Sequence, residues 1–350
     1  MKTFRRKGKP VRKSFEVLAA PGFFEIALKA TPQEIEKAGA AERKEELKKS
    51  SDPQTVRVSR FADLPVEHFE KIGESTFSEV FMNKETETVF KVLPLTAHKE
   101  YKKVQHTKID HFLKEVLVME KMNRSESSVR IHRWWVVEDV YPKGLVDKCR
   151  KWAKSNQEIA ENAIPLKNNS SGVFGVIEME HGGRELAALE KEGVDKETAE
   201  QIIEGIKKCV ASLNEMEVEH RDMHESNVLL KKEKDGRVAV KAIDYSLSRA
   251  SWSGEGAGSV AVRLFTKDTL TFETGRVLYT DIDKEVPWLF SGTDGQPHRE
   301  VYKKMDLCYA GTDRWRKKGD SNYFWLIYLT DWVKKITTEK KTPASEKDLE

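Results

Sequence analysis

The first half of the chain carries the hydrophobic pattern of a β-sheet. Apolar and β-branched positions alternate or cluster in short runs, which is typical of strands. These runs cover residues 66–93, 131–142 and 173–179. Residues 144–172, between the last two runs, are polar, and Asn168-Asn169-Ser170-Ser171-Gly172 indicates a loop.

Helical spacing appears once within this region and then dominates the second half. Phe112, Val116 and Met119 lie on one face of a helix predicted at about residues 111–120. A longer stripe at positions i, i+3, i+4 and i+7 predicts an amphipathic helix formed around Ala199, Ile202, Ile203, Ile206, Val210 and Leu213. Residues 322–329 are apolar on nearly every side and predict a buried core helix. The chain therefore predicts an α+β fold, with a strand-rich unit followed by a helical one.

The two ends differ from the middle. Seven basic residues crowd the first thirteen positions, namely Lys2, Arg5, Arg6, Lys7, Lys9, Arg12 and Lys13. Such a tail is typical of a nuclear-import signal or a nucleic-acid-binding arm, although a disordered solubilising terminus has the same composition. Thr31-Pro32-Gln33-Glu34 is a helix-start pattern and predicts a helix to about Lys49. The charged tail from Thr337 is expected to be disordered.

Composition narrows the class of protein. With 350 residues and 38% hydrophobic content, the chain can bury one large core or two smaller ones. No apolar run approaches the roughly 20 residues that span a bilayer, and no apolar signal-peptide region begins the chain, so we expect neither membrane insertion nor secretion. Cys149, Cys209 and Cys308 are odd in number and widely separated. This pattern favours a reducing compartment and disfavours a disulfide framework or a zinc site.

The most informative motif is His220-Arg221-Asp222-Met223-His224-Glu225-Ser226-Asn227. Its spacing matches the catalytic loop of protein kinases, where a carboxylate lies beside the substrate hydroxyl and an amide five residues on contacts a metal. One short match can arise by chance. The order of the remaining motifs therefore decides the interpretation.

That order is the order of a kinase. Residues 71–80 occupy the place of a glycine-rich nucleotide loop, and Lys91 interrupts the apolar run 89–93. A buried cation needs a partner, and Glu115 in the next predicted helix is the candidate. Asp244 ends a strand-like run after the catalytic loop. Singly, a snorkelling lysine, a solvated glutamate and a turn-forming aspartate would explain these residues; as an ordered set they favour a kinase.

A hinge is predicted where the strand-like run 173–179 ends. Glu180-His181-Gly182-Gly183 follows this run directly and lies between the two predicted lobes. The backbone N–H and C=O groups of such a segment can pair with the edge of adenine, while Met179 borders the pocket. A plain glycine turn would have the same sequence, but its position between the lobes favours the hinge.

The motifs resemble one kinase family in particular. Ile243-Asp244-Tyr245-Ser246-Leu247-Ser248-Arg249 is similar to the segment that haspin-type kinases carry in place of Asp-Phe-Gly. Residues 220–224 look like the catalytic loop of that family, and 277–283, 289–292, 313–315 and 328–331 resemble further family segments in the same order. The likeness covers about residues 57–335. It implies a bilobal protein-kinase-like fold with an N-terminal extension (1–56), an N-lobe (57–180), a C-lobe (181–336) and a charged tail (337–350).

The resemblance also implies a site for ATP and magnesium. Lys91 would hold the α- and β-phosphates, Glu115 would orient Lys91, and Asp222 would accept the proton of the substrate threonine. Asn227 and Asp244 would bind magnesium. The nucleotide-binding set implied in this way is Ile72, Gly73, Ser75, Val80, Lys91, Met179, Glu180, Gly182, Glu185, Asn227 and Asp244.

The substrate implied by the resemblance is a threonine near the start of the histone H-three tail, phosphorylated in mitosis without activation-loop phosphorylation. A basic peptide calls for acidic groups, and the substrate set is His224, Glu185, Asp281, Asp283 and Asp294. His224 stands where most serine/threonine kinases have lysine. We expect a nuclear, chromosome-associated monomer, with a chromatin or DNA contact through residues 1–13 as an open alternative for that tail.

One departure from the family lies in the nucleotide loop. Ser75 and Ser78 stand where the family has glycines, and only Gly73 remains. Their Cβ atoms would hold the loop slightly away from phosphate, which predicts weakened ATP affinity but retained activity. Two alternatives stay open at this point: a pseudokinase scaffold that binds a basic chromatin partner without catalysis, and a chromatin-tethering protein that acts through its basic N-terminus.

Overall fold

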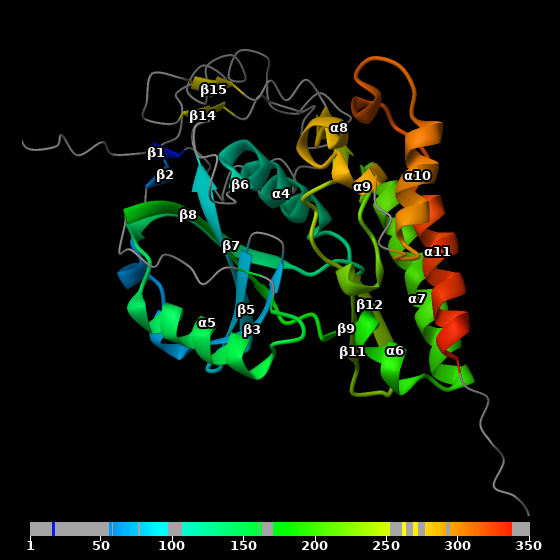
Figure 1. Cartoon of the computed structure of the whole chain (residues 1–350), viewed down its shortest axis with the longest axis horizontal. Helices are drawn as coiled ribbons and strands as arrows, with labels where there is room; N and C mark the ends of the chain where they lie inside the picture. Colours follow the sequence, from blue (N-terminus) through cyan, green and yellow to red (C-terminus); the bar gives the residue numbers. More distant parts are fainter. Residues whose placement is uncertain are drawn as a thin grey trace, which may run out of the picture.

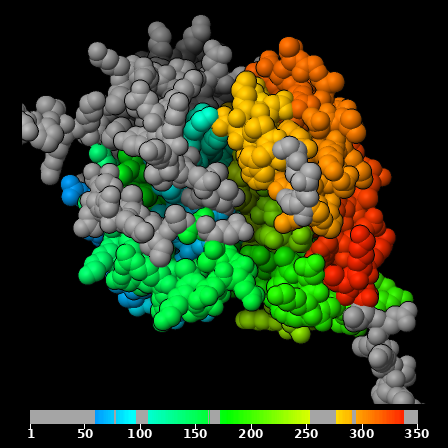
Figure 2. All heavy atoms as spheres, in the orientation of Figure 1, coloured from blue at the N-terminus to red at the C-terminus, as the bar shows by residue number. Residues whose placement is uncertain are grey.

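The computed structural model describes residues 16–17, 56–57, 59–75, 78–96, 107–160, 162, 171–252, 261–263, 269–271, 277–291 and 295–337. The basic arm 1–13, the helix predicted from Thr31, Asp294 and the tail beyond Thr337 lie outside these residues. The described part forms two lobes that lie side by side (Figure 1). In the space-filling view, the second lobe, coloured from bright green through yellow to red, forms one side of the molecule, and α5 (Lys143–Ser155), in blue-green, covers the lower part of the other (Figure 2).

The first lobe is built on a six-stranded sheet in the order β3-β4-β5-β8-β7, with β6 paired to β5. Its neighbours are antiparallel except for the parallel β5–β6 pair. The strands are β3 (Phe69–Ser75), β4 (Ser78–Asn83), β5 (Thr88–Thr96), β6 (Thr107–Lys108), β7 (Ile131–Val140) and β8 (Ser171–Glu180). The strand-rich unit predicted from the sequence is therefore confirmed.

Strand periodicity divides the side chains of β5 between two helices. Phe90 and Val92 point into a core with α5 (Lys143–Ser155), whereas Val89 and Leu93 belong to the core that includes α4 (Ile109–Met122). Side chains alternate along a strand, so Lys91 lies on the α4 face. The sheet thus delivers the lysine to the helix that carries its predicted partner.

The sequence analysis described residues 144–172 only as polar and predicted no helix there, but α5 occupies Lys143–Ser155. Leu145, Val146 and Cys149 are buried against the sheet. These three residues form a short apolar stripe at helical spacing. The basic residues around them make the segment polar on average, so the helix was not predicted. Helix α5 lies along one face of the sheet in Figure 1.

The second lobe is mainly helical, as expected. Its helices are α6 (Leu189–Glu192), α7 (Lys196–Glu215), α8 (Ile282–Glu285), α9 (Trp288–Ser291), α10 (Arg299–Cys308) and α11 (Ser321–Ile336). The amphipathic helix predicted around residues 199–213 is α7, which begins with Asp195 accepting a hydrogen bond from the Thr198 N–H. Helices α7, α10 and α11 pack side by side (Figure 1).

Helix α11 corrects one expectation. Residues 322–329 were expected to be buried on nearly every side, yet Tyr323 is 58% exposed and Ile327 is 40% exposed. The helix packs against α7 and α10 through Trp325, Leu329 and Val333, so only one of its faces is covered.

Short strands connect the helices and carry the site. Two three-stranded sheets have the orders β12-β11-β9 and β10-β13-β16, and two-stranded sheets pair β1 with β2 and β14 with β15. Their bounds are β1 (Glu16–Val17), β2 (Val56–Arg57), β9 (Arg184–Glu185), β10 (Val218–Glu219), β11 (Val228–Lys232), β12 (Val238–Ala242), β13 (Arg249–Ser251), β14 (Ala261–Arg263), β15 (Thr269–Thr271) and β16 (Val277–Tyr279). Within the described ranges, no helix has the length and apolar content needed to traverse a bilayer.

Candidate active site

Lys91 is the centre of a buried charge cluster between the lobes. Its ammonium lies 2.7 Å from Glu115 Oε1 and 3.1 Å from Asp244 Oδ2. Burial alone would lower the pKa of Lys91, but the two carboxylates outweigh burial and raise it above the ordinary lysine value. Lys91 is therefore held as a cation.

Asp244 follows β12 and adopts a left-handed backbone with φ of 61°. This conformation is unusual for a residue with a Cβ and is typical of strained functional positions. Its Oδ1 accepts a hydrogen bond from the Ser246 N–H at 3.1 Å. The charge of Lys91 and this hydrogen bond outweigh burial and hold the pKa of Asp244 well below its usual range.

The catalytic-loop motif runs from β10 to the short helix η4 (Glu225–Asn227) and is anchored from below by Arg221. Arg221 is fully buried, has φ of 66°, and donates to Glu219 Oε2 at 3.0 Å and to the Trp315 carbonyl at 2.6 Å. His220 is also buried, and its Nε2 lies 2.9 Å from the Ile243 carbonyl. The loop is thereby tied to the segment around Trp315 and to Ile243, the residue directly before Asp244.

Asp222 lies at the centre of this loop with hydrogen bonds on both carboxylate oxygens. Asn227 Nδ2 donates to the Asp222 main-chain carbonyl at 2.8 Å and to its Oδ2 at 3.3 Å. The phenol of Tyr302, from α10, donates to Oδ1. Burial raises the pKa of Asp222 to about 8, and the hydrogen bond from Tyr302 acts in the opposite direction.

Asn227 and Asp244 offer the oxygen ligands that magnesium prefers. Because Asn227 Nδ2 is used in the bonds to Asp222, its Oδ1 is the atom that could contact a metal. No group of three or more His, Cys, Asp or Glu side chains in the described part of the chain could hold a metal ion by itself. The two residues fit a magnesium ion that takes its remaining ligands from nucleotide phosphates and water.

The nucleotide-loop segment is a hairpin between β3 and β4. Ser75 and Ser78 are paired across the two strands, and their hydroxyl oxygens are 2.7 Å apart. A Cβ added to Gly73 would meet no atom within 4 Å, Ile72 is 40% exposed, and Val80 is partly buried. The serines therefore fasten the hairpin together, and the expected weakening of ATP binding stays a prediction.

The same hairpin is braced from outside by residues that the sequence did not single out. Asn162 Nδ2 donates to the Ser75 carbonyl at 3.0 Å and to the Ser78 carbonyl at 3.1 Å. The buried Lys71 pairs with Glu74 at 2.6 Å and also with Glu79. Its ammonium lies 4.3 Å from the ring centroid of Trp152 in α5.

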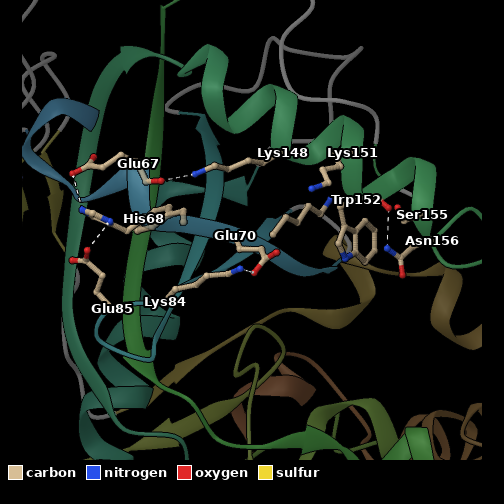
Figure 3. A pocket seen from close by; sticks show the side chains of 12 residues that line it. Glu67, His68, Glu70, Lys84, Glu85, Lys148, Lys151, Trp152, Ser155 and Asn156 are labelled. Carbon is tan, nitrogen blue, oxygen red and sulfur yellow. Dashed lines mark hydrogen bonds and ion pairs between the residues drawn. The ribbon is translucent and has the colours of Figure 1, made fainter.

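Lys71 and Trp152 also line a polar groove of about 590 Å³ between β3 and α5. Lys148, Lys151 and Trp152 project from α5 toward the β3 side in Figure 3. None of the residues lining the groove belongs to the Lys91 and Asp222 clusters, so the groove is separate from the candidate active site.

The hinge predicted at Glu180 lies at the end of β8. Its carboxylate is turned toward Lys241 Nζ at 2.6 Å and the Arg130 N–H at 2.9 Å, and Met179 is almost buried. Gly182 packs between Val129 and Leu229, where any Cβ would clash. Both contacts fix how the chain passes from the first lobe to the second.

The predicted substrate residues are more dispersed. Glu185 lies in β9, near His224. Burial raises the pKa of Glu185, and the charge of His224 acts to lower it. Asp281 pairs with Lys284 at 2.6 Å, and Asp283 pairs with Arg314. The structure thus brings Glu185 toward the catalytic loop, occupies the other two aspartates in local ion pairs, and does not describe Asp294.

Lys114, next to Glu115 in α4, is a second residue that sequence reasoning missed. It is buried and donates to the Ser246 carbonyl at 2.5 Å, the Ser248 carbonyl at 3.2 Å and Thr280 Oγ1 at 2.5 Å. Burial lowers the pKa of Lys114 to about 7. The signal that the sequence offered for Lys114 was its position next to Glu115 in the predicted helix.

The sequence was compared with known families and proteins. A model of the family described as "Haspin like kinase domain" matches residues 40–350. Serine/threonine-protein kinase haspin of Bos taurus is 26% identical over 294 residues, which cover 79% of this chain and 36% of that protein. The Arabidopsis thaliana haspin homolog is 23% identical over 308 residues, covering 80% of this chain and 46% of that protein.

A third relative, the haspin homolog hrk1 of Schizosaccharomyces pombe, is 24% identical over 288 residues, covering 77% of this chain and 56% of that protein. The chain therefore spans between about a third and just over half of the length of these curated relatives. The family match extends over nearly the whole chain and agrees with the two-lobed α+β fold. The chain belongs to the haspin-like kinase domain family and is a protein kinase domain.

Proposed function

We propose that this chain transfers the γ-phosphoryl group of ATP to a threonine near the start of a basic histone H-three tail, in mitosis and on chromosomes. One observation carries the catalytic part. Lys91, Glu115 and Asp244 form one ion cluster, and Asp222 and Asn227 are hydrogen-bonded in the loop beside it. A pseudokinase scaffold would have no need to maintain all five groups.

The roles follow from the charges. Lys91 binds the α- and β-phosphates, and Glu115 keeps its ammonium pointed toward them. Asn227 and Asp244 would hold a magnesium ion, which would supply positive charge to the triphosphate oxygens. Asp222 accepts the proton of the substrate hydroxyl, which makes the hydroxyl oxygen a better nucleophile.

A basic substrate is supported by the acidic groups around the catalytic loop. Glu185 is exposed, Glu225 is partly exposed, and both lie near His224. Burial lowers the pKa of His224, although the neighbouring carboxylates act to raise it. These carboxylates are candidates for binding a lysine or arginine of the peptide. Asp281 and Asp283 would have to leave Lys284 and Arg314 to do the same.

The catalytic proposal is tested with radiolabelled ATP, magnesium and a histone H-three tail peptide. Wild type should label the peptide and Asp222→Asn should not, because the amide cannot accept the proton. Equal labelling by the two proteins would remove the catalytic claim. Labelling of a peptide whose threonine is replaced by alanine would remove the claim about the substrate while leaving the kinase intact.

A further inference from the structure

Tyr302 is the one residue outside the catalytic loop that donates to the Asp222 carboxylate within the described part of the chain. It lies 80 positions away in sequence, on the buried face of α10. Tyr302 is 2% exposed, and its ring packs edge-on against Trp325 of α11 with the centroids 5.4 Å apart. The phenol is therefore fixed by the helical lobe and aimed at the loop.

The ring of Tyr302 also faces two histidines that lead to the catalytic loop. Its ring is edge-on to His298, with centroids 6.2 Å apart, and His298 stacks on His224 at 5.1 Å. His224 Nε2 in turn lies 3.2 Å from Asn227 Nδ2. A continuous layer of aromatic rings thus connects α10 with the loop that holds Asp222.

We propose that Tyr302 is a positioning residue for phosphoryl transfer: its hydroxyl holds Asp222 Oδ1, so that Oδ2 is the oxygen presented to the substrate hydroxyl. A carboxylate oxygen has two lone pairs, and Oδ2 uses one of them for the long contact to Asn227. The second remains available for the incoming hydroxyl. Without the phenol, the carboxylate could rotate and present its oxygens in several orientations.

Tyr302 undergoes no chemical change during the reaction. The substrate O–H proton passes to Asp222 Oδ2, the substrate oxygen forms a bond to the γ-phosphorus, and the bridging P–O bond breaks with its electron pair leaving on ADP. Tyr302 keeps its own proton throughout. Its contribution is the orientation of the base, which is a condition for general-base catalysis.

The test is Tyr302→Phe, which removes the hydroxyl and keeps the ring that packs against Trp325. A hydrogen bond to a charged group is strong, so we expect kcat to fall about tenfold or more. The KM for ATP and the affinity for nucleotide measured by direct binding should stay within about twofold, because no contact to the nucleotide is lost. A purely structural role would instead change binding and thermal stability together.

Tyr141→Phe is the matched control. It removes the same atom from another buried tyrosine, one that packs in the first-lobe core with Phe61 and Phe174, and kcat should be unchanged. A double variant tests whether Tyr302 acts through Asp222. In an Asp222→Asn background, Tyr302→Phe should lower the residual rate no further, because the base that Tyr302 orients is gone.

Three results would overturn the assignment: a Tyr302→Phe enzyme within about twofold of wild type in kcat, a protein that no longer binds nucleotide, or a fully additive effect in the Asp222→Asn background. The inference rests on the proposed kinase activity. Failure of that activity would appear in wild type, using the histone peptide or any basic protein as acceptor. Failure of the Tyr302 assignment would appear only in the ratio between variant and wild type.

Discussion

Replacing Asn162 by alanine should weaken ATP binding without unfolding the enzyme. The side-chain amide of Asn162 bridges the carbonyls of Ser75 and Ser78, one on each strand of the nucleotide-loop hairpin. The main-chain N–H of residue 162, which donates to Glu74 at 2.9 Å, would remain in the variant. The substitution therefore removes the bridge and leaves the segment otherwise attached.

The expected size follows from the two hydrogen bonds to the loop carbonyls, since the third contact of the same amide, to Glu79 Oε1, is long at 3.5 Å. A neutral hydrogen bond contributes about 0.5–1.5 kcal/mol net, so the pair is worth about 1–3 kcal/mol. Since about 1.4 kcal/mol corresponds to a factor of ten, the affinity for ATP should fall between about fivefold and 150-fold. We expect a value near tenfold, because water can replace part of the bridge, and we expect kcat to change little. The reason is preorganisation: a loop held in place loses less conformational entropy on binding.

The assay is steady-state kinetics with ATP varied at saturating peptide, together with direct nucleotide binding. Asn156→Ala is the control, because Asn156 directly follows α5 and its side-chain amide donates to the Trp152 carbonyl at 2.8 Å rather than to the hairpin. It should leave the KM for ATP unchanged. An Asn162→Ala enzyme whose KM and dissociation constant for ATP stay within about twofold of wild type would refute the idea that this bridge prepares the loop.

Three further predictions concern stability, each measured by urea or thermal unfolding. Lys71→Met should destabilise the fold by about 3–5 kcal/mol, because it leaves two buried carboxylates without their cation. Its control, Lys84→Met, removes an exposed ion pair and should cost less than about 1 kcal/mol. Similar values for the two variants would contradict the role of the buried ion pairs. Gly183→Ala should destabilise the fold by well over about 1 kcal/mol, because φ is 105° and the added methyl would overlap the Leu230 carbonyl. Gly236→Ala, with φ of 86° and open space around the methyl, should cost about 1 kcal/mol. Equal costs would contradict the close packing at Gly183. Burial lowers the pKa of His220 to about 4 from an unfolded value of about 6.5. The free energy of unfolding should therefore be at its full value above pH 6.5 and fall by about 3 kcal/mol as the pH drops from 6.5 to 4. The same pH dependence in a His220→Asn variant would contradict the assignment to His220.

The sequence was sufficient to predict the ion cluster because short-range periodicities place its members. Lys91 alternates with Phe90 and Val92 along one strand, and Glu115 lies on the buried side of one helix. Each residue can be assigned to a face from its immediate neighbours. The order of kinase motifs then pairs the two faces, and the observed distance of 2.7 Å agrees with that pairing.

The supporting residues could not be found in this way. Tyr302 reads as one more apolar position beside Val301 and Met305, since nothing local reveals that its hydroxyl reaches Asp222. Asn162 contacts strands that lie more than 80 positions earlier, and its own segment has no periodic pattern. Contacts of this kind depend on the packing of whole helices. Sequence periodicity gives the face of each element but not the partner across it.

Helix α4 offers a physical reason for expecting activity without activation-loop phosphorylation. On adjacent positions, Glu115 binds Lys91 and Lys114 binds the two carbonyls that follow Asp244. The residue that caps the start of the helix adds a third attachment, because Lys108 Nζ lies 2.6 Å from Glu285 Oε1 in α8.

In kinases that require phosphorylation, new ion pairs made by the phosphate order the segment after the metal-binding aspartate and bring this helix into position. Here Lys114 of α4 and the N-cap residue Lys108 make comparable connections through their own side chains. Lys114 Nζ has three oxygen acceptors, two of them carbonyls of the segment after Asp244, which favours one arrangement of that segment over alternatives. The expectation of constitutive activity thus follows from where two neighbouring side chains of one helix are bound.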